Sequence, residues 1–185
     1  MKTGIEKKDI RLLDLPALQD TLTGMGEPKF RAKQIHEWLW KKGASSFDEM
    51  TNLPKKLREN LIDHFSINTI SIDKVQKSLD GTIKSRFRLH DNHLIESVLI
   101  PVPVDRRYTV CVSSQVGCSL TCKFCATGQM KRHRNLDAGE IYDQVVAVNQ
   151  QSLENFDHPL TNIVYMGMGE PLLAYRNVME SVELI

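Results

Sequence analysis

The chain has 185 residues, of which 41% are hydrophobic, and a formal net charge of +1. This length allows one or two domains with buried cores. The near-neutral charge excludes a generally basic nucleic-acid-binding protein, so any RNA contact has to come from local patches. The first eight residues lack the apolar run of a signal peptide, and no later stretch is long enough to span a bilayer. We therefore expect a soluble, cytoplasmic protein.

Residues 1–68 are predicted to form a small helical domain. Leucines recur from residue 12 to residue 22 and stop before a turn that contains two glycines. Apolar residues return at helical spacing between residues 29 and 42, and Pro54 opens a further helix. The lysines and arginines of these helices are typical either of a solvated helical cap or of an RNA-docking module.

Residues 69–104 are predicted to form a connection of β-strands. Side chains alternate between apolar and basic from residue 83 to residue 89, and the Asp-Gly pair at residue 80 predicts a tight hairpin turn before them. Two more apolar strands are predicted near residues 93–100 and 108–113. Together these strands indicate a β-meander that leads into another domain.

Residues 105–185 alternate strand, helix, strand and helix around a cluster of cysteines. Asp137 and Glu140 are spaced as a capping pair for a long helix. A short apolar strand follows at residues 162–165, and another helix begins near residue 173. This order predicts a parallel α/β sheet, which needs more strands than are present. The predicted fold class is therefore α/β, with an incomplete last domain.

All four cysteines of the chain lie in one short stretch. Cys118, Cys122 and Cys125 can face one site from a single loop, and three thiolates hold three irons of a four-iron cluster while the fourth iron stays open. Zinc is the main alternative, with Cys111 or His133 as the fourth ligand. Buried, inert thiols are a further alternative.

A glycine-rich turn, Gly167-Met168-Gly169-Glu170-Pro171, follows the short strand at residues 162–165. Ligands of α/β proteins bind at the carboxyl ends of strands, and glycines let the backbone approach them. By itself such a turn is more often structural than functional. Because it follows a three-cysteine loop by one helix and one strand, it indicates a clamp for the methionyl amine of S-adenosylmethionine, with Glu170 as the acceptor.

These motifs together resemble the RlmN family, radical S-adenosylmethionine enzymes that methylate adenine C2 in 23S ribosomal RNA and transfer RNA. The resemblance rests on residues 111–118, 122–128, 134–136 and 167–171, and on the stretch from Phe30 that leads to Trp38. It implies the first part of a radical SAM (β/α) partial barrel over residues 105–185, truncated, behind the helical domain and the β-meander.

The resemblance also implies the cofactors and the residues that bind them. It assigns a [4Fe-4S] cluster to Cys118, Cys122 and Cys125, and the open iron of that cluster would chelate S-adenosylmethionine. Gly169 and Glu170 would contact S-adenosylmethionine as well.

Two further residues match catalytic positions of the family. Glu96 matches the proton acceptor, although alone it is typical of an outward carboxylate on a strand. Cys111 matches the thiol that resolves a covalent protein–RNA adduct by forming a transient disulfide bond. The methyl-carrying cysteine near the C-terminus of the family has no counterpart among the four cysteines. We therefore expect an N-terminal fragment that holds a cluster but does not methylate alone.

The implied partners are 23S rRNA, tRNA and an electron donor such as flavodoxin or ferredoxin, with the chain as a monomer. Basic residues near the cysteines could meet phosphates or form a solvated loop: Lys123, Lys131, Arg132, His133 and Arg134. Two rival functions stay open. One is the related adenine-C8 rRNA methyltransferase that confers antibiotic resistance, and the other is a non-catalytic, zinc-stabilised RNA-binding module.

Overall fold

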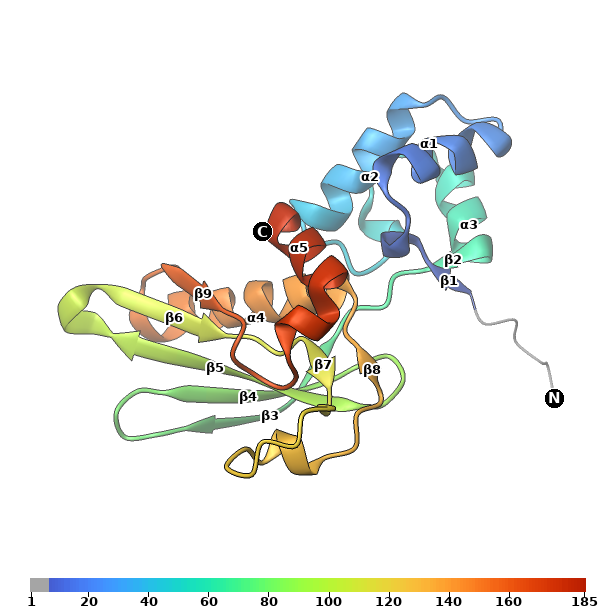
Figure 1. Ribbon diagram of the computed structural model, residues 1–185. Coiled ribbons are helices and arrows are strands. Elements are labelled where there is room, and N and C mark those ends of the chain that lie inside the picture. The colour runs from blue at the N-terminus through green and yellow to red at the C-terminus, as the bar shows by residue number, and fades with distance from the viewer. Residues whose placement is uncertain (1–6) are drawn as a thin grey trace. The chain divides into compact units, whose positions relative to one another are not determined.

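The computed structural model describes residues 7–185, so most of the N-terminal segment for which no signal peptide is expected lies outside it. The chain divides into two compact units, the first ending at Asn68 and the second running from Thr69 to Ile185 (Figure 1). Among the described residues, no helix is long and apolar enough to cross a membrane.

The first unit is mainly helical, as the sequence predicts. Its elements are β1 (Lys8–Asp9), the short 3-10 helix η1 (Ile10–Leu12), α1 (Leu15–Gly24), α2 (Phe30–Trp40), η2 (Phe47–Glu49), α3 (Lys55–His64) and β2 (Phe65–Ser66). The three α-helices bury leucines and isoleucines at helical spacing, including Leu22, Ile35 and Leu61, which are fully buried.

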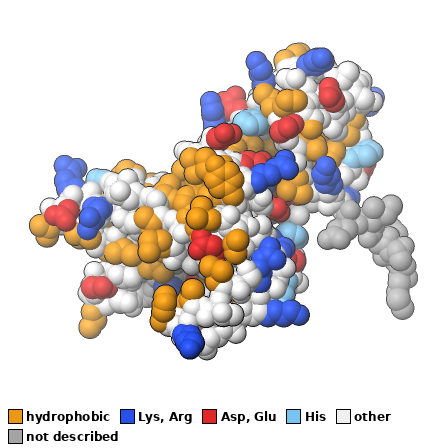
Figure 2. Space-filling model, viewed as in Figure 1, with side chains coloured by type: hydrophobic (Ala, Val, Ile, Leu, Met, Phe, Trp, Pro, Cys, Tyr) orange, Lys and Arg blue, Asp and Glu red, His pale blue; other side chains and the backbone are white. Residues whose placement is uncertain are grey.

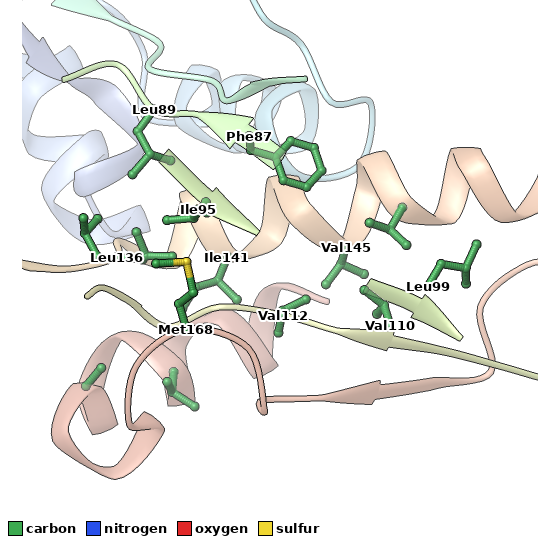
Figure 3. Close-up of a cluster of buried hydrophobic side chains, with 14 of the residues drawn as sticks. Phe87, Leu89, Ile95, Leu99, Val110, Val112, Leu136, Ile141, Val145 and Met168 are labelled. Atoms are coloured by element: carbon green, nitrogen blue, oxygen red, sulfur yellow. The ribbon is translucent and has the colours of Figure 1, made fainter. Parts of the chain in front are cut away.

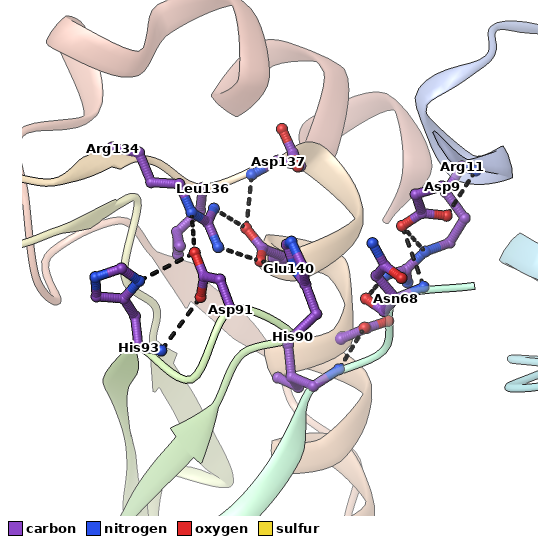
Figure 4. Close-up of polar contacts among 12 residues, drawn as sticks. Asp9, Arg11, Asn68, His90, Asp91, His93, Arg134, Leu136, Asp137 and Glu140 are labelled. Atoms are coloured by element: carbon purple, nitrogen blue, oxygen red, sulfur yellow. Dashed lines mark hydrogen bonds and ion pairs between the residues drawn. The ribbon is translucent and has the colours of Figure 1, made fainter. Parts of the chain in front are cut away.

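The ends of the first unit are joined by β1 and β2, which pair in parallel, Lys8 with Phe65. Asp9 is buried beside this pair, and its carboxylate accepts hydrogen bonds from the backbone of Arg11 and of Asn68 (Figure 4). A buried carboxylate needs such partners, so this contact fixes the two ends of the unit to each other.

The second unit is built on a five-stranded sheet of order β3-β4-β5-β6-β9. Its strands are β3 (Ser71–Lys77), β4 (Ile83–Arg88), β5 (Leu94–Val102), β6 (Arg107–Cys111) and β9 (Asn162–Val164). The first four strands are antiparallel neighbours, and β9 pairs with β6 in parallel. The predicted meander is therefore present, and the last strand adds the predicted parallel pair.

The connection from β6 to β9 contains α4 (Ala138–Phe156), which packs on one face of the sheet. Asp137 and Glu140 form the predicted capping box at its start. The helix and the sheet share an apolar core in which Phe87, Ile95 and Ile141 are fully buried (Figure 3). The opposite face of the sheet is not covered by α4.

The remaining elements are short, except for the last helix. They are η3 (Pro103–Asp105), β7 (Gln115–Val116), η4 (Thr127–Gln129), β8 (Arg134–Asn135), η5 (Pro171–Ala174) and α5 (Tyr175–Leu184). Large apolar side chains are exposed on η5 and α5, and Figure 2 shows hydrophobic side chains gathered over α5. Strands β5 and β6 flank η3 in the chain and pair with each other. The strands expected to form a separate connection and the strand expected to start the last domain therefore belong to one sheet.

Candidate functional site

The cysteine loop is closed at its base by a two-stranded ribbon. Strands β7 and β8 pair antiparallel, Gln115 with Asn135 and Val116 with Arg134, so the intervening residues leave and re-enter the fold at one place. Gly117 begins the loop with a φ of +74°, and a Cβ atom there would lie 2.2 Å from the carbonyl oxygen of Lys131. Only glycine fits this backbone.

The three cysteines of the loop are free thiols and half-buried. The backbone N–H of Leu120 lies 3.4 Å from the Sγ atom of Cys118, and the N–H of Cys125 donates to the carbonyl of Cys122. Within residues 7–185, no group of three or more His, Cys, Asp or Glu side chains is arranged to hold a metal ion. The donor chemistry of the loop suits a cluster, since it offers three thiols on one turn, but the sulfurs are not gathered.

A charged network anchors the end of the cysteine loop to the rest of the unit (Figure 4). The guanidinium of Arg134 makes two hydrogen bonds to the carboxylate of Glu140, at 2.7 and 2.8 Å, and one to Asp91 at 2.6 Å. Glu140 is 2% exposed, and a carboxyl group buried to this extent needs such hydrogen-bond partners. Arg134 is therefore occupied within the fold, whereas the other basic residues proposed to meet phosphates are exposed: Lys123, Lys131, Arg132 and His133.

The electrostatics of this network follow from burial and pairing. Burial alone would raise the pKa of Asp91, but hydrogen bonds from Arg134 and His93 hold that pKa well below its usual range. Burial would likewise lower the pKa of Arg134, yet the hydrogen bonds to Glu140 and Asp91 raise it. Asp91 and Arg134 are therefore both charged at neutral pH.

The glycine-rich turn packs against the segment that leads into the cysteine loop. A Cβ atom on Gly167 would lie 2.7 Å from the backbone of Val112 and Ser113, and one on Gly169 would lie 2.5 Å from the side chain of Gln115. The N–H of Glu170 donates to Oε1 of Gln115 at 2.9 Å. The glycine-rich turn is therefore packed against residues 112–115, the same segment that leads into the cysteine loop.

Gln115 connects three parts of the site at once. It is fully buried, its Oε1 accepts from Glu170, and its Nε2 donates to Asn135 in β8 at 2.8 Å. The Glu170 carboxylate accepts from the N–H of Leu172 at 3.1 Å and is partly exposed. The structure therefore brings the predicted S-adenosylmethionine residues next to the base of the cysteine loop.

A second buried polar group links Glu96 to the same turn. The hydroxyl of Ser113 donates to the carbonyl of Glu96 at 2.6 Å and accepts from the N–H of Met168 at 2.9 Å. Gln144 of α4 accepts from the N–H of Ser113 and donates to its carbonyl, and it also accepts from Ser97. The backbone at Glu96 is therefore tied to the glycine-rich turn through one serine.

Glu96 and Cys111 lie on the sheet face opposite α4. Cys111 pairs with Val98, which is two residues from Glu96 and points to the same side. The Glu96 carboxylate lies 3.2 Å from the ammonium of Lys84. Burial raises the pKa of the Cys111 thiol, and a hydrogen bond from the backbone of Met166 opposes that shift. Cys111 is a free thiol in the structure.

Sequence reasoning did not single out Ser113, Gln115 or Gln144 as parts of the site. Two of them lie inside the motif around the first cysteine, and all three are polar residues that are fully buried. A usable signal was Gln144 on the apolar side of α4, between Ile141 and Val148, where an unpaired amide would be costly. Phe124, which directly precedes Cys125, is 94% exposed.

The chain combines a helical unit, a sheet covered by one helix, and a three-cysteine loop beside a glycine-rich turn. These features together define the class of protein to which the chain is related. A crystal structure of a radical SAM methyltransferase from Sphaerobacter thermophilus matches it with a TM-score of 0.80 and 43% identity, covering 96% of this chain and 51% of that one. The fold is thus that of radical SAM methyltransferases over about half their length.

The sequence comparisons identify the family. Residues 9–67 match the ribosomal RNA large subunit methyltransferase N-terminal domain. Proteins called probable dual-specificity RNA methyltransferase RlmN are 55% identical in Cytophaga hutchinsonii and 54% identical in Flavobacterium psychrophilum, over 99% and 98% of this chain. The chain belongs to the RlmN family. It spans about half the length of the curated relatives it matches, 50% and 52% of these two.

Proposed function

We propose that this chain contributes to the radical S-adenosylmethionine-dependent methylation of adenine C2 in 23S rRNA and tRNA. The observation that carries the proposal is Gln115, which joins the base of the cysteine loop to the backbone of Glu170. The two motifs that would hold the cluster and S-adenosylmethionine are thereby fixed to one another. The match of residues 9–67 to the rRNA methyltransferase N-terminal domain supports RNA as the substrate. We prefer the C2 reaction to the C8 reaction because the N-terminal and cysteine-loop residues resemble those of the RlmN family.

In this proposal Cys118, Cys122 and Cys125 hold a [4Fe-4S] cluster, which, when bound, supplies the electron that cleaves the sulfonium of S-adenosylmethionine. A flavodoxin or ferredoxin would provide that electron. Gly169 leaves room for the backbone to turn beside Gln115, and Glu170 presents a partly exposed carboxylate to the methionyl amine.

Glu96 and Cys111 would act on the RNA base from the open face of the sheet. Glu96 is proposed as the proton acceptor, and its carboxylate lies 3.2 Å from the ammonium of Lys84. Cys111 is proposed as the thiol that resolves the covalent adduct by a transient disulfide. Because burial raises the pKa of this thiol, it is mostly protonated at neutral pH and needs a base to attack.

Anaerobic reconstitution of the 185-residue chain with iron and sulfide tests the proposal. We expect about four irons per chain, a brown absorption that dithionite bleaches, and retention of S-adenosylmethionine in equilibrium dialysis. Cys118→Ser should lose the absorption, whereas the matched control Cys111→Ser should keep it. One tightly held zinc ion without S-adenosylmethionine binding would instead establish the zinc-stabilised module and contradict the proposal.

A further inference from the structure

The open face of the sheet carries a hollow lined by side chains from three strands. In Figure 1 α4 lies behind the sheet, so this face is turned toward the reader. Ile83, Ser85 and Phe87 of β4 point toward α4 and are buried, and the residues between them point the other way. The hollow is lined by Lys74, Gln76, Lys84, Arg86 and Glu96.

The register of the sheet explains why these five side chains meet. Lys74 pairs with Arg86 and Gln76 with Lys84 across β3 and β4, while Arg86 pairs with Glu96 across β4 and β5. Paired residues of neighbouring strands project to the same face. The hollow is therefore a consequence of strand pairing and does not depend on a loop.

The lining has an excess of positive charge. It holds three cations and one carboxylate, an excess of two. Asp73 reduces the free charge of Arg86, but it shares its carboxylate with Arg88, so including both residues leaves the excess unchanged. Lys74 is exposed and has no partner among residues 7–185. The face thus presents cations that the fold itself does not neutralise.

The charged side chains that line the hollow contribute little to the stability of the sheet. Lys84 and Glu96 form an ion pair whose side chains are 43% and 41% exposed, and such an exposed pair contributes little to the stability of a protein. Lys74 and Lys84 lie on the same face, where their like charges repel each other weakly. An anion that binds between them would use both charges.

The position of the hollow relates it to the proposed catalytic residues. Lys84 pairs with Val98, and Val98 pairs with Cys111, so the three lie in one row across β4, β5 and β6. With about 4.8 Å between neighbouring strands, the backbones of Lys84 and Cys111 are about 10 Å apart. Glu96 itself belongs to the lining.

We propose that this hollow binds a backbone phosphate of the substrate RNA, beside the nucleotide on which Glu96 and Cys111 act. The inference rests on the proposed function, because it takes RNA as the substrate. Lys74 and Lys84 supply the charge, and Arg86, held by Asp73, presents the remaining N–H donors of its guanidinium. Contacts of this kind position RNA without reading its sequence.

The sheet offers a matched control for the test. Lys77 also lies on β3, but it pairs with the buried Ile83 and its ammonium contacts Asn155 of α4. Lys77→Gln therefore removes one positive charge from the same strand on the opposite face. Lys74→Gln and Lys84→Gln remove one charge each from the hollow and preserve the length of the side chain approximately.

The experiment measures binding of a fluorescein-labelled single-stranded RNA that contains adenine, by fluorescence anisotropy, across a series of salt concentrations. We expect the double variant Lys74→Gln/Lys84→Gln to bind roughly tenfold more weakly and to lower the slope of log K against log salt by about one to two. The loss should be equal for RNAs of different sequence. Lys77→Gln should change the affinity less than twofold.

Equal weakening by Lys77→Gln and by the hollow variants would overturn the inference, and so would no measurable RNA binding by the unaltered chain. Reconstitution with iron and sulfide on the same variants separates this result from the proposed function. A chain that forms the cluster and binds S-adenosylmethionine, but whose RNA affinity ignores Lys74 and Lys84, refutes the phosphate site alone. A chain without a cluster refutes the proposed function even if the anisotropy result stands.

Discussion

Arg134 shows at the scale of one residue how the cysteine loop is attached to its unit. Its guanidinium contacts Glu140 at the start of α4 and Asp91 in the turn before β5, so one side chain joins three segments. The side chain of Glu140 is 3% exposed, whereas that of Arg134 is 27% exposed. Breaking the contact would therefore cost more free energy at the buried carboxylate of Glu140 than at the guanidinium of Arg134.

Replacing Arg134 by alanine should destabilise the second unit. The change leaves Glu140 buried with fewer partners, and we expect a loss of about 3 kcal/mol in the free energy of unfolding. Urea unfolding followed by circular dichroism measures it. Arg176→Ala, on the exposed side of α5, is the control and should change the free energy by less than about 0.5 kcal/mol. Similar losses in both variants would contradict the assignment.

The lowered pKa of Asp91 predicts a pH dependence with a definite sign. A carboxyl group whose pKa is depressed by folding contributes stability that is complete above its unfolded pKa, about 3.9, and is lost as the pH falls toward the folded value. The unaltered chain should therefore be more stable than Asp91→Asn near pH 6, and the difference should shrink near pH 3.5. Urea midpoints at both pH values test this. A difference that is constant with pH would show that the charge of Asp91 contributes nothing.

At the scale of the element, α4 combines an apolar face with two buried glutamines. Gln144 bonds to Ser97 and Ser113, and Gln151 accepts from Ser85, so the helix is joined to β4, β5 and the residues after β6 by polar contacts inside the core. Apolar packing alone allows a helix to slide on a sheet, whereas these bonds specify one position.

Gln144→Leu should cost the second unit about 2–4 kcal/mol, because it leaves the backbone N–H of Ser113 and the hydroxyl of Ser97 buried without their acceptor. Hydrogen exchange should report the effect locally, as faster exchange at Met168, whose N–H donates to Ser113. Gln150→Leu changes an exposed neighbour on the same helix and is the control. Unchanged hydrogen exchange at Met168 would contradict a coupling between α4 and the glycine-rich turn.

At the scale of the whole molecule, the two units have separate cores, one around Leu61 and one around Phe87. Both tryptophans of the chain, Trp38 and Trp40, lie in the first unit. Tryptophan fluorescence therefore reports on that unit, whereas circular dichroism reports on both.

We expect the two units to unfold separately. Leu61→Ala should lower the urea midpoint of tryptophan fluorescence, since it removes about 2–5 kcal/mol of core packing. Phe87→Ala should shift a transition seen by circular dichroism and leave the fluorescence midpoint in place. If Phe87→Ala moved both midpoints equally, the chain would unfold as one cooperative body.

Patterns of short range in the sequence predicted most elements of the fold correctly. The capping box at Asp137, the meander and the strand before the glycine-rich turn all appear, because each depends on residues a few positions apart. The cysteine and glycine motifs were recognised for the same reason. What could not be predicted depends on register: that Arg86 faces Glu96, or that Gln115 meets Glu170 fifty-five residues later.

Gln115 makes hydrogen bonds both to the base of the cysteine loop and to the glycine-rich turn, and this has a consequence for protein engineering. The cysteine loop is not a transferable cassette by itself, because its base is shaped by a turn from a later part of the chain. A graft of residues 115–135 into another scaffold would need the segment 167–170 beside it, together with a glycine wherever the two backbones touch. The smallest portable part is therefore a pair of segments with the interface between them.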